Sequence, residues 1–182
     1  MINYGEGVYL GPLVKRDLEL YRHWRNRESI RSWCRQDDLI DERAQEDWYY
    51  RQSQDPRIRM YAIYSEDDDM PRGVCGLTDL DFLHRRAEFS LYIDPESQGR
   101  GYAKAALKTL FTWGFDNFNL NLIWGESFAG NPAIKIFESL GMMRDGERRD
   151  FYFVKGSFKS AYLYSIRASE WKNSFSSEEF AI

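Results

Sequence analysis

The six residues Gln98-Gly99-Arg100-Gly101-Tyr102-Ala103 have the types and spacing of an anion-binding turn. They follow an apolar, strand-like run at 89–93 and precede a helical pattern from about 101 to 115. The two glycines allow a tight turn and a close approach of the backbone to a ligand. The first N–H groups of a helix have no partner within it, and the helix dipole adds positive potential there. We therefore predict an anion site suited to a pyrophosphate.

The elements around this turn predict one α/β domain, 1–182, with a mixed sheet. Residues 86–93 alternate apolar and polar side chains, as in a strand with two distinct faces. Other strands are predicted at 7–14, 58–64, 73–82, 120–126, 142–154 and 158–166. Helices are predicted at 18–26, 28–33, 42–52, 101–115 and 131–140.

Local signals refine these boundaries. Asp17 and Asp41 are candidate N-caps, and Gly141 is the expected C-terminal stop of the last helix. The helix at 42–52 is expected to turn Ala44, Trp48 and Tyr49 inward, and the acidic run 65–69 to form a solvated hairpin loop.

Composition narrows the class of protein. The 182 residues are 43% hydrophobic and 30% charged, which is typical of a soluble globular domain. The net charge of −4 argues against nucleic acid or an anionic membrane as the main partner. Cys34 and Cys75 fit a reducing compartment and show no metal-ligand spacing, so no metal is expected. No signal peptide or long apolar run is evident, and we expect a cytoplasmic monomer or homodimer.

The order of the motifs resembles the GCN5-related N-acetyltransferase (GNAT) superfamily. The resemblance rests on Gln98-x-x-Gly101-x-Ala103 between a strand and a helix, and on a later helix ending Phe137-Glu138-Ser139-Leu140-Gly141-Met142. It covers about residues 6–168, and implies an acyl-CoA N-acyltransferase fold with a mostly antiparallel central sheet and helices on both faces. A dinucleotide site would instead need G-x-G-x-x-G near the start of a βαβ unit, and only Gly99-x-Gly101 is present.

The resemblance implies acetyl-CoA as co-substrate, held in a V-shaped gap between the strand ending at Ile93 and the strand beginning near Leu120. The backbone of Leu91, Tyr92 and Ile93 would pair with the pantetheine, and an N–H near Ile93 would polarise the thioester carbonyl. The pyrophosphate would bind the N–H groups of Gln98, Gly99, Arg100, Gly101, Tyr102 and Ala103.

The later helix departs from the family pattern at two places. Asn131 and Ala133 resemble a second cofactor contact, but the usual asparagine position holds Gly130, and Asn131 could equally be an N-cap. Phe137 stands where many members carry a tyrosine thought to protonate the CoA thiolate. Either the thiolate leaves unaided, which a thiol pKa of about 8.5 permits, or another group serves. Tyr92 and Tyr152 are candidates for that group by residue type alone.

Carboxylates on the strands beside the gap are candidates for the general base that deprotonates the amine. Glu88 comes first, because it lies on the polar side of the strand before the glycine turn, where family members often place a glutamate. Glu126 comes second, and Asp79 and Asp81 third. The alternative for each is a surface carboxylate or one paired with a neighbouring arginine.

The N-terminal helices are expected to form the acceptor side, as in the family. Flat aromatic rings and guanidinium groups occur together there, in Trp24, Arg25, Asn26, Trp33 and Arg35. The alternative is core tryptophans with solvated arginines. Deprotonating a lysine-like amine at pH 7 costs about 4.6 kcal/mol, against about 1–1.4 kcal/mol for an α-amine. This difference favours low-pKa amines over lysine or polyamines.

The sequence thus predicts an acetyl-CoA-dependent N-acetyltransferase that works by direct attack of a bound amine, with an amino sugar or nucleotide-linked amine as the preferred acceptor. Acetylation of a protein N-terminus, as in the ribosomal-protein branch of the family, is the enzymatic alternative. A CoA-binding module without catalysis is the alternative of another class, suggested by Phe137.

Overall fold

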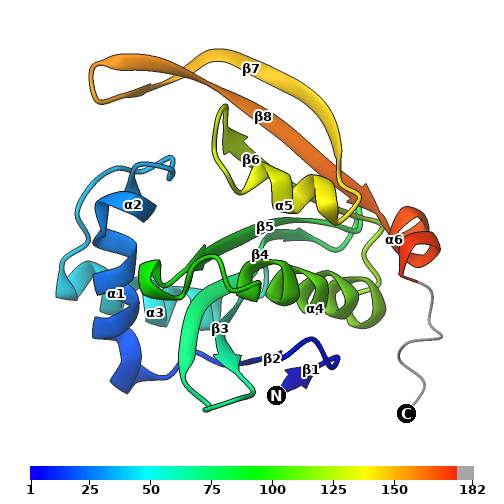
Figure 1. Cartoon of the computed structure of the whole chain (residues 1–182), viewed down its shortest axis with the longest axis horizontal. Coiled ribbons are helices and arrows are strands. Elements are labelled where there is room, and N and C mark those ends of the chain that lie inside the picture. Colours follow the sequence, from blue (N-terminus) through cyan, green and yellow to red (C-terminus); the bar gives the residue numbers. More distant parts are fainter. Residues whose placement is uncertain (176–182) are drawn as a thin grey trace.

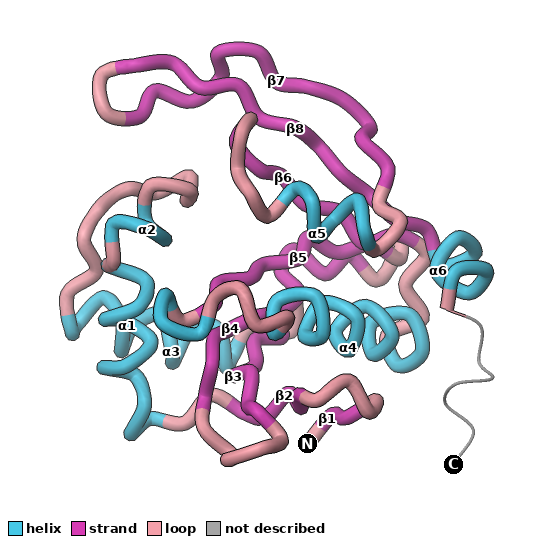
Figure 2. The backbone as a smooth tube through the Cα atoms, viewed as in Figure 1, coloured by secondary structure: helices cyan, strands magenta, loops and turns pink. Residues whose placement is uncertain are grey.

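The computed structural model describes residues 1–175 as a single twisted sheet with helices on both faces (Figure 1, Figure 2). The strands are β1 (Ile2–Asn3), β2 (Val8–Pro12), β3 (Arg59–Ser65), β4 (Pro71–Asp81), β5 (Arg86–Ile93), β6 (Leu122–Phe128), β7 (Met143–Val154) and β8 (Ser157–Arg167). The helices are α1 (Leu18–Asn26), α2 (Glu28–Arg31), α3 (Glu42–Gln54), α4 (Tyr102–Asn117), α5 (Ile134–Ser139) and α6 (Ala168–Ser174). Short 3-10 turns, η1 (Lys15–Asp17) and η2 (Pro95–Ser97), precede α1 and follow β5.

The sheet is mostly antiparallel, as predicted. Its strands run in the order β1-β2-β3-β4-β5-β6-β8-β7, and among these neighbours only β5 and β6 are parallel. That one parallel pair requires a crossover, which α4 provides. The mixed α/β fold class is confirmed.

The parallel pair is short, and this creates the gap in the sheet. β5 and β6 are in register only at Arg86↔Leu122, Ala87↔Ile123 and Glu88↔Trp124. Beyond Glu88, β5 continues to Ile93 along β4, while β6 continues to Phe128 along β8. The two strands therefore part just after Glu88, and their facing edges have no strand between them in the described part of the chain.

Two apolar cores fix the faces of the sheet. Neighbouring residues on one strand point to opposite faces, and on β3 Ile63 packs into one core while Ala62 packs into the other. The larger core joins the sheet to α4, α5 and α6, and the smaller one joins it to α1 and α3. Helices therefore cover both faces, which confirms the predicted layering.

The predicted caps have different outcomes. Asp41 caps α3, accepting the Ala44 N–H at 2.7 Å on its Oδ1, whereas Asp17 makes no side-chain cap bond because the chain enters α1 directly from η1. Gly141 ends the turn after α5 at a φ of 80°, as expected. The inward face of α3 was predicted incorrectly in part, since Ala44 is exposed while Gln45 and Gln52 are buried.

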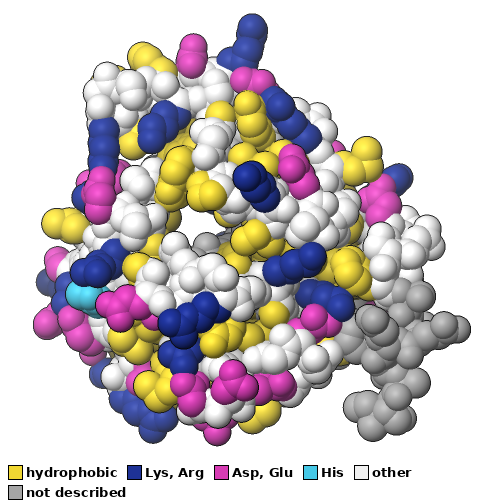
Figure 3. Space-filling view, viewed as in Figure 1, with side chains coloured by type: hydrophobic (Ala, Val, Ile, Leu, Met, Phe, Trp, Pro, Cys, Tyr) yellow, Lys and Arg dark blue, Asp and Glu magenta, His cyan; other side chains and the backbone are white. Residues whose placement is uncertain are grey.

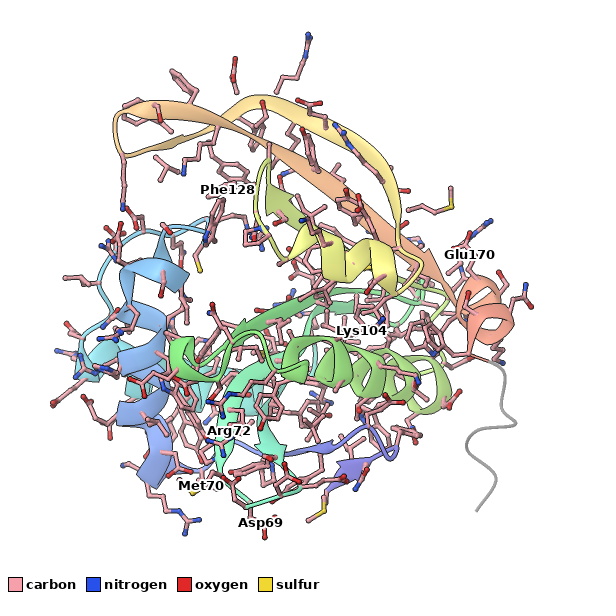
Figure 4. The ribbon with its side chains drawn as sticks, in the orientation of Figure 1. Asp69, Met70, Arg72, Lys104, Phe128 and Glu170 are labelled. Carbon is pink, nitrogen blue, oxygen red and sulfur yellow. The ribbon has the colours of Figure 1, made fainter. Side chains whose placement is uncertain are left out.

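Two elements were not predicted, β1 and α6. α6 brings Trp171 into the larger core, where it is 3% exposed and contacts Phe111 edge-on. The acidic run 65–69 is the predicted hairpin loop, closed by the Asp69 N–H on the Ser65 carbonyl at 3.0 Å. Figure 4 places Asp69 at the edge of the molecule, far from the gap. None of the helices in residues 1–175 is long and apolar enough to cross a membrane.

Candidate active site

The vertex of the gap is marked by Glu88, the last β5 residue that pairs with β6. Its side chain is buried, with the whole residue 5% exposed. Glu126 lies on β6 just beyond the point of divergence, and its side chain is 1% exposed. The two residues predicted as first and second candidates for the base thus lie on opposite walls of the gap. Asp79 and Asp81 lie on β4, behind β5 as seen from the gap.

A guanidinium group joins the two carboxylates. Arg35, from the loop between α2 and α3, donates from one terminal nitrogen to Glu88 Oε1 at 2.6 Å. Its other terminal nitrogen lies 3.7 Å from Glu126 Oε2. The same Glu126 oxygen accepts hydrogen bonds from Tyr152 Oη at 2.9 Å and from Arg148 at 3.2 Å. Segments distant in the sequence, the α2–α3 loop, β5, β6 and β7, therefore meet in one charged cluster.

Burial and charge act against each other on Glu88. Burial is the largest effect and raises the pKa of the Glu88 carboxyl, and the negative charges of Asp79 and Glu126 raise it further. Arg35 lowers this pKa, but the net result stays above the ordinary glutamate value. Burial lowers the pKa of the Arg35 guanidinium, but Glu88, Tyr152 and Glu126 outweigh that effect and leave it raised. Burial and then Glu126 raise the pKa of Tyr152.

Only some of the predicted acceptor residues reach this cluster. Trp24 is 5% exposed and packs in the core under α1. Asn26 accepts the Ile40 N–H at 2.8 Å and donates to the Ile40 carbonyl at 2.7 Å, so it anchors the loop. Arg25 likewise donates to the Gln36 carbonyl at 3.0 Å. The structure shows packing or anchoring partners for these three side chains, and their predicted contact with the acceptor stays a prediction.

Arg35 reaches the cluster, and Trp33 lies beside Lys159 of β8. The Lys159 ammonium on β8 lies 5.7 Å from the centre of the Trp33 ring and 5.5 Å from that of Phe128. Figure 3 shows a hollow in this face of the molecule between the α1–α2 region and the β6–α5 region, and Figure 4 labels Phe128 on its β6 side. Sequence reasoning missed Arg148 and Lys159, because their relevance depends on how the β7–β8 hairpin folds over the gap.

The glycine turn has the geometry expected of a phosphate site. Gly99 and Gly101 have φ values of 78° and 88°, and α4 begins directly after Gly101. Residues 98–101 are exposed. Gln98 donates its side-chain amide to the Ile93 carbonyl at 3.3 Å, which ties the turn to the end of β5. Arg72, labelled in Figure 4, lies 5.9 Å from the Tyr102 ring at the start of α4. The free first-turn N–H groups can therefore meet an anion in the gap.

Asn131 and Phe137, the two positions that depart from the family pattern, lie in the turn before α5 and within α5. Asn131 accepts the Ala133 N–H at 2.9 Å on its own Oδ1, so its side chain caps the turn that leads into α5. Phe137 is buried, with its ring edge-on to Phe89 at 5.0 Å and to Tyr164 at 5.9 Å between centroids. It forms a flat apolar wall and has no proton to donate.

The candidate replacements for a tyrosine at this position are held elsewhere. Burial raises the pKa of Tyr92, which packs with the α1–α3 core, and Tyr152 is hydrogen-bonded to Glu126.

Within residues 1–175 no three His, Cys, Asp or Glu side chains are grouped as metal ligands.

Comparison with known proteins decides the family. A model described as an acetyltransferase (GNAT) domain matches residues 8–143. The chain belongs to the GNAT family. Spermidine N(1)-acetyltransferase of Escherichia coli K12 is 30% identical over 160 residues, which are 87% of this chain and 85% of that protein. A putative ribosomal N-acetyltransferase of Bacillus subtilis is 31% identical over 101 residues, 55% of each chain.

The fold agrees with that of solved GNAT structures. Spermidine N-acetyltransferase of Vibrio cholerae, crystallised with CoA and spermine, superposes with a TM-score of 0.86 at 23% identity, covering 92% of this chain and 99% of that one. Family, relatives and fold together make this chain an acetyl-CoA-dependent N-acetyltransferase. They do not favour the amino-sugar or nucleotide-linked acceptor that the sequence predicted, since two relatives that match 87–90% of this chain are named for spermidine.

Proposed function

We propose that the acceptor of this GNAT enzyme is a polyamine such as spermidine. The observation that carries the proposal is the pair of buried carboxylates, Glu88 and Glu126, which already hold a cationic guanidinium between them where β5 and β6 part. An ammonium group has three donors and no acceptor, so it suits the same oxygens. The spermidine acetyltransferases of E. coli and V. cholerae among the relatives support this choice of substrate class.

The nitrogens of a polyamine are easier to deprotonate than a lone lysine-like amine. In a polyamine each ammonium group lies near others of like charge, and like charges disfavour the charged form of each. The cost of deprotonating one nitrogen is therefore lower than for a lone lysine-like amine. A base with a raised pKa reduces it further, and burial gives Glu88 such a pKa.

The reaction we propose is direct transfer. The exposed turn at 98–101 and the first N–H groups of α4 bind the pyrophosphate of acetyl-CoA, and the free edge of β5 at Leu91, Tyr92 and Ile93 pairs with the pantetheine. Glu88 accepts a proton from the acceptor ammonium, and the amine nitrogen attacks the thioester carbonyl carbon. The carbon–sulfur bond then breaks, the nitrogen releases its second proton to solvent to give the neutral amide, and the sulfur leaves as a thiolate beside the apolar Phe137 ring.

A thiol-release assay tests the acceptor. Acetyl-CoA is held at saturation, and spermidine, spermine, a simple monoamine, an amino sugar and a peptide with a free N-terminus are compared. We expect the highest kcat/KM with the polyamines. A higher value for the peptide would favour protein N-terminal acetylation, and a higher value for the amino sugar would contradict the proposed polyamine site. Binding of CoA with no turnover on any amine would favour a CoA-binding module.

A further inference from the structure

Arg35 occupies the position that the acceptor's ammonium group needs. Its guanidinium lies at the vertex of the gap, 2.6 Å from Glu88 Oε1 and 3.7 Å from Glu126 Oε2. Glu88 is the residue we assign as base, and a base can take a proton from an amine only within hydrogen-bond reach of it. In the structure that approach to Glu88 Oε1 is taken by a permanent cation of the protein itself.

The loop does not need this contact to keep its shape. Arg25 and Asn26 of α1 hold the backbone at Gln36 and Ile40 through three hydrogen bonds of 3.0, 2.7 and 2.8 Å. Arg31 adds a bond of 3.0 Å to Asp37 Oδ1. The Arg35 side chain itself is 48% exposed. It can therefore turn into solvent while the loop backbone stays in place.

The carboxylate cluster has spare acceptor capacity. Glu126 uses Oε2 for Tyr152 and Arg148, while its Oε1 is buried and has no hydrogen-bond partner within the described residues. A buried carboxylate oxygen without a donor is costly. A compact ammonium with three donors suits an oxygen of this kind, whereas the Arg35 guanidinium approaches Glu126 at Oε2, at 3.7 Å.

We propose that Arg35 is a resident counter-ion of the empty acceptor site, which the ammonium group of the substrate must displace before Glu88 can act. The inference rests on the proposed polyamine function and concerns how Arg35 controls acceptor binding in the same site. Without Arg35, Glu88 and Glu126 would face each other buried, balanced by Arg148 alone. With it, the charge of the two carboxylates is neutralised, and the apparent Kd of every acceptor is its intrinsic Kd divided by the fraction of molecules in which Arg35 is displaced.

The test compares Arg35→Ala with Arg149→Ala. Arg149 is an exposed arginine on β7, next in the chain to Arg148, so its replacement matches the change in net charge without touching the cluster. At saturating acetyl-CoA we expect the KM for spermidine to fall about fivefold or more in Arg35→Ala. The KM should change more than kcat does, and Arg149→Ala should resemble the wild type.

Two further readouts separate this role from a structural one. Free guanidinium, at millimolar concentrations that do not unfold the protein, should enter the vacated position. It should inhibit Arg35→Ala competitively with spermidine and have little effect on the wild type. The groups facing Glu88 are Arg35, Asp79 and Glu126, so loss of Arg35 removes the one that lowers its pKa. The acidic limb of kcat/KM should therefore move to higher pH in Arg35→Ala.

An unchanged or higher KM for spermidine in Arg35→Ala would overturn the inference, as would equal inhibition of both proteins by guanidinium. If the wild type turns over no polyamine, the proposed function fails by itself. Calorimetric titration of guanidinium into Arg35→Ala and into the wild type then tests the role of Arg35 separately. Circular dichroism confirms that both proteins are folded. Binding to Arg35→Ala but not to the wild type supports the resident counter-ion, and binding to neither overturns it.

Discussion

The carboxylates of Glu88 and Glu126 lie where β5 and β6 part, and their different hydrogen-bond partners suit them to different roles. Among residues 1–175, Arg35 is the cationic side chain paired with Glu88, and it is half exposed. Glu126 is fixed by Tyr152 and Arg148 from β7. A base must gain and lose a proton each turnover, whereas a carboxylate held by two donors is suited to fixing charge and orientation. We therefore propose Glu88 as the base and a positioning role for Glu126.

Glu88→Gln should lower kcat by about 10²–10⁴-fold, the usual contribution of a positioned base. Burial, as the largest effect, raises the Glu88 pKa. Glu88 must be ionised to accept the proton, so kcat/KM should decrease as the pH falls through the pKa of Glu88. This pKa should lie above the ordinary glutamate value. That limb should vanish in Glu88→Gln and persist in Glu126→Gln, the matched control. The opposite pattern in a pH–rate profile would move the base to Glu126.

Phe137 cannot protonate the CoA thiolate as a tyrosine could, but direct transfer does not require that proton. Its ring packs edge-on against Phe89 and Tyr164, which fixes an apolar wall. A thiol with a pKa of about 8.5 is an acceptable leaving group as the thiolate. Glu88 then passes the proton it has taken to solvent, and the thiolate takes up a proton from solvent once the products separate.

At the scale of elements, the gap depends on close packing where β5 and β6 part. A Cβ added at Gly125 on β6 would overlap the ring of Phe89 on β5, and that ring also contacts Phe111 and Phe137. The first residue of β6 beyond its last pair with β5 is therefore small because an aromatic ring of the partner strand lies against its backbone.

Gly125→Ala should destabilise the protein by about 1–3 kcal/mol through overpacking. It should also weaken CoA binding, because the displaced Phe89 ring pushes on the Phe137 wall. Gly146→Ala on β7 is the control, since nothing lies within 4 Å of a Cβ added there. Denaturant unfolding and CoA titration measure both effects, and Phe89→Leu should partly rescue Gly125→Ala. Equal stability of the two alanine variants would contradict this packing role.

The elements that sequence predicted well are those whose signals are local. The strand at 86–93, the glycine turn before α4 and the cap at Asp41 each depend on a few consecutive residues, and each is present in the structure. The roles that differ depend on distant partners. Trp24 is core because α1 packs on the sheet, and Asn26 anchors a loop ending fourteen residues away. The link from Arg35 to Glu88 spans 53 residues, which no local pattern reveals.

At the scale of the whole molecule, the acceptor side is closed by two pieces that meet across the hollow of Figure 3. One piece is α2 with the loop after it, and the other is the β7–β8 hairpin, which reaches over the gap in Figure 1. Lys155 at the hairpin turn pairs with Glu28 at the start of α2, and Lys159 on β8 lies over Trp33. These contacts join the N-terminal and C-terminal thirds of the chain around the site.

Lys155→Glu should open this closure, because it places a second carboxylate against Glu28. Both partners are largely exposed, so global stability should change little. Hydrogen exchange should instead accelerate at the hairpin turn around 154–157, and the KM for spermidine should rise as the hairpin ceases to hold its side of the site. The charge-swapped pair Lys155→Glu with Glu28→Lys should restore slow exchange and the original KM. Faster exchange spread over the whole sheet would indicate a loss of fold, and unchanged exchange at the turn would show that the two pieces are held by Trp33 and Lys159 alone.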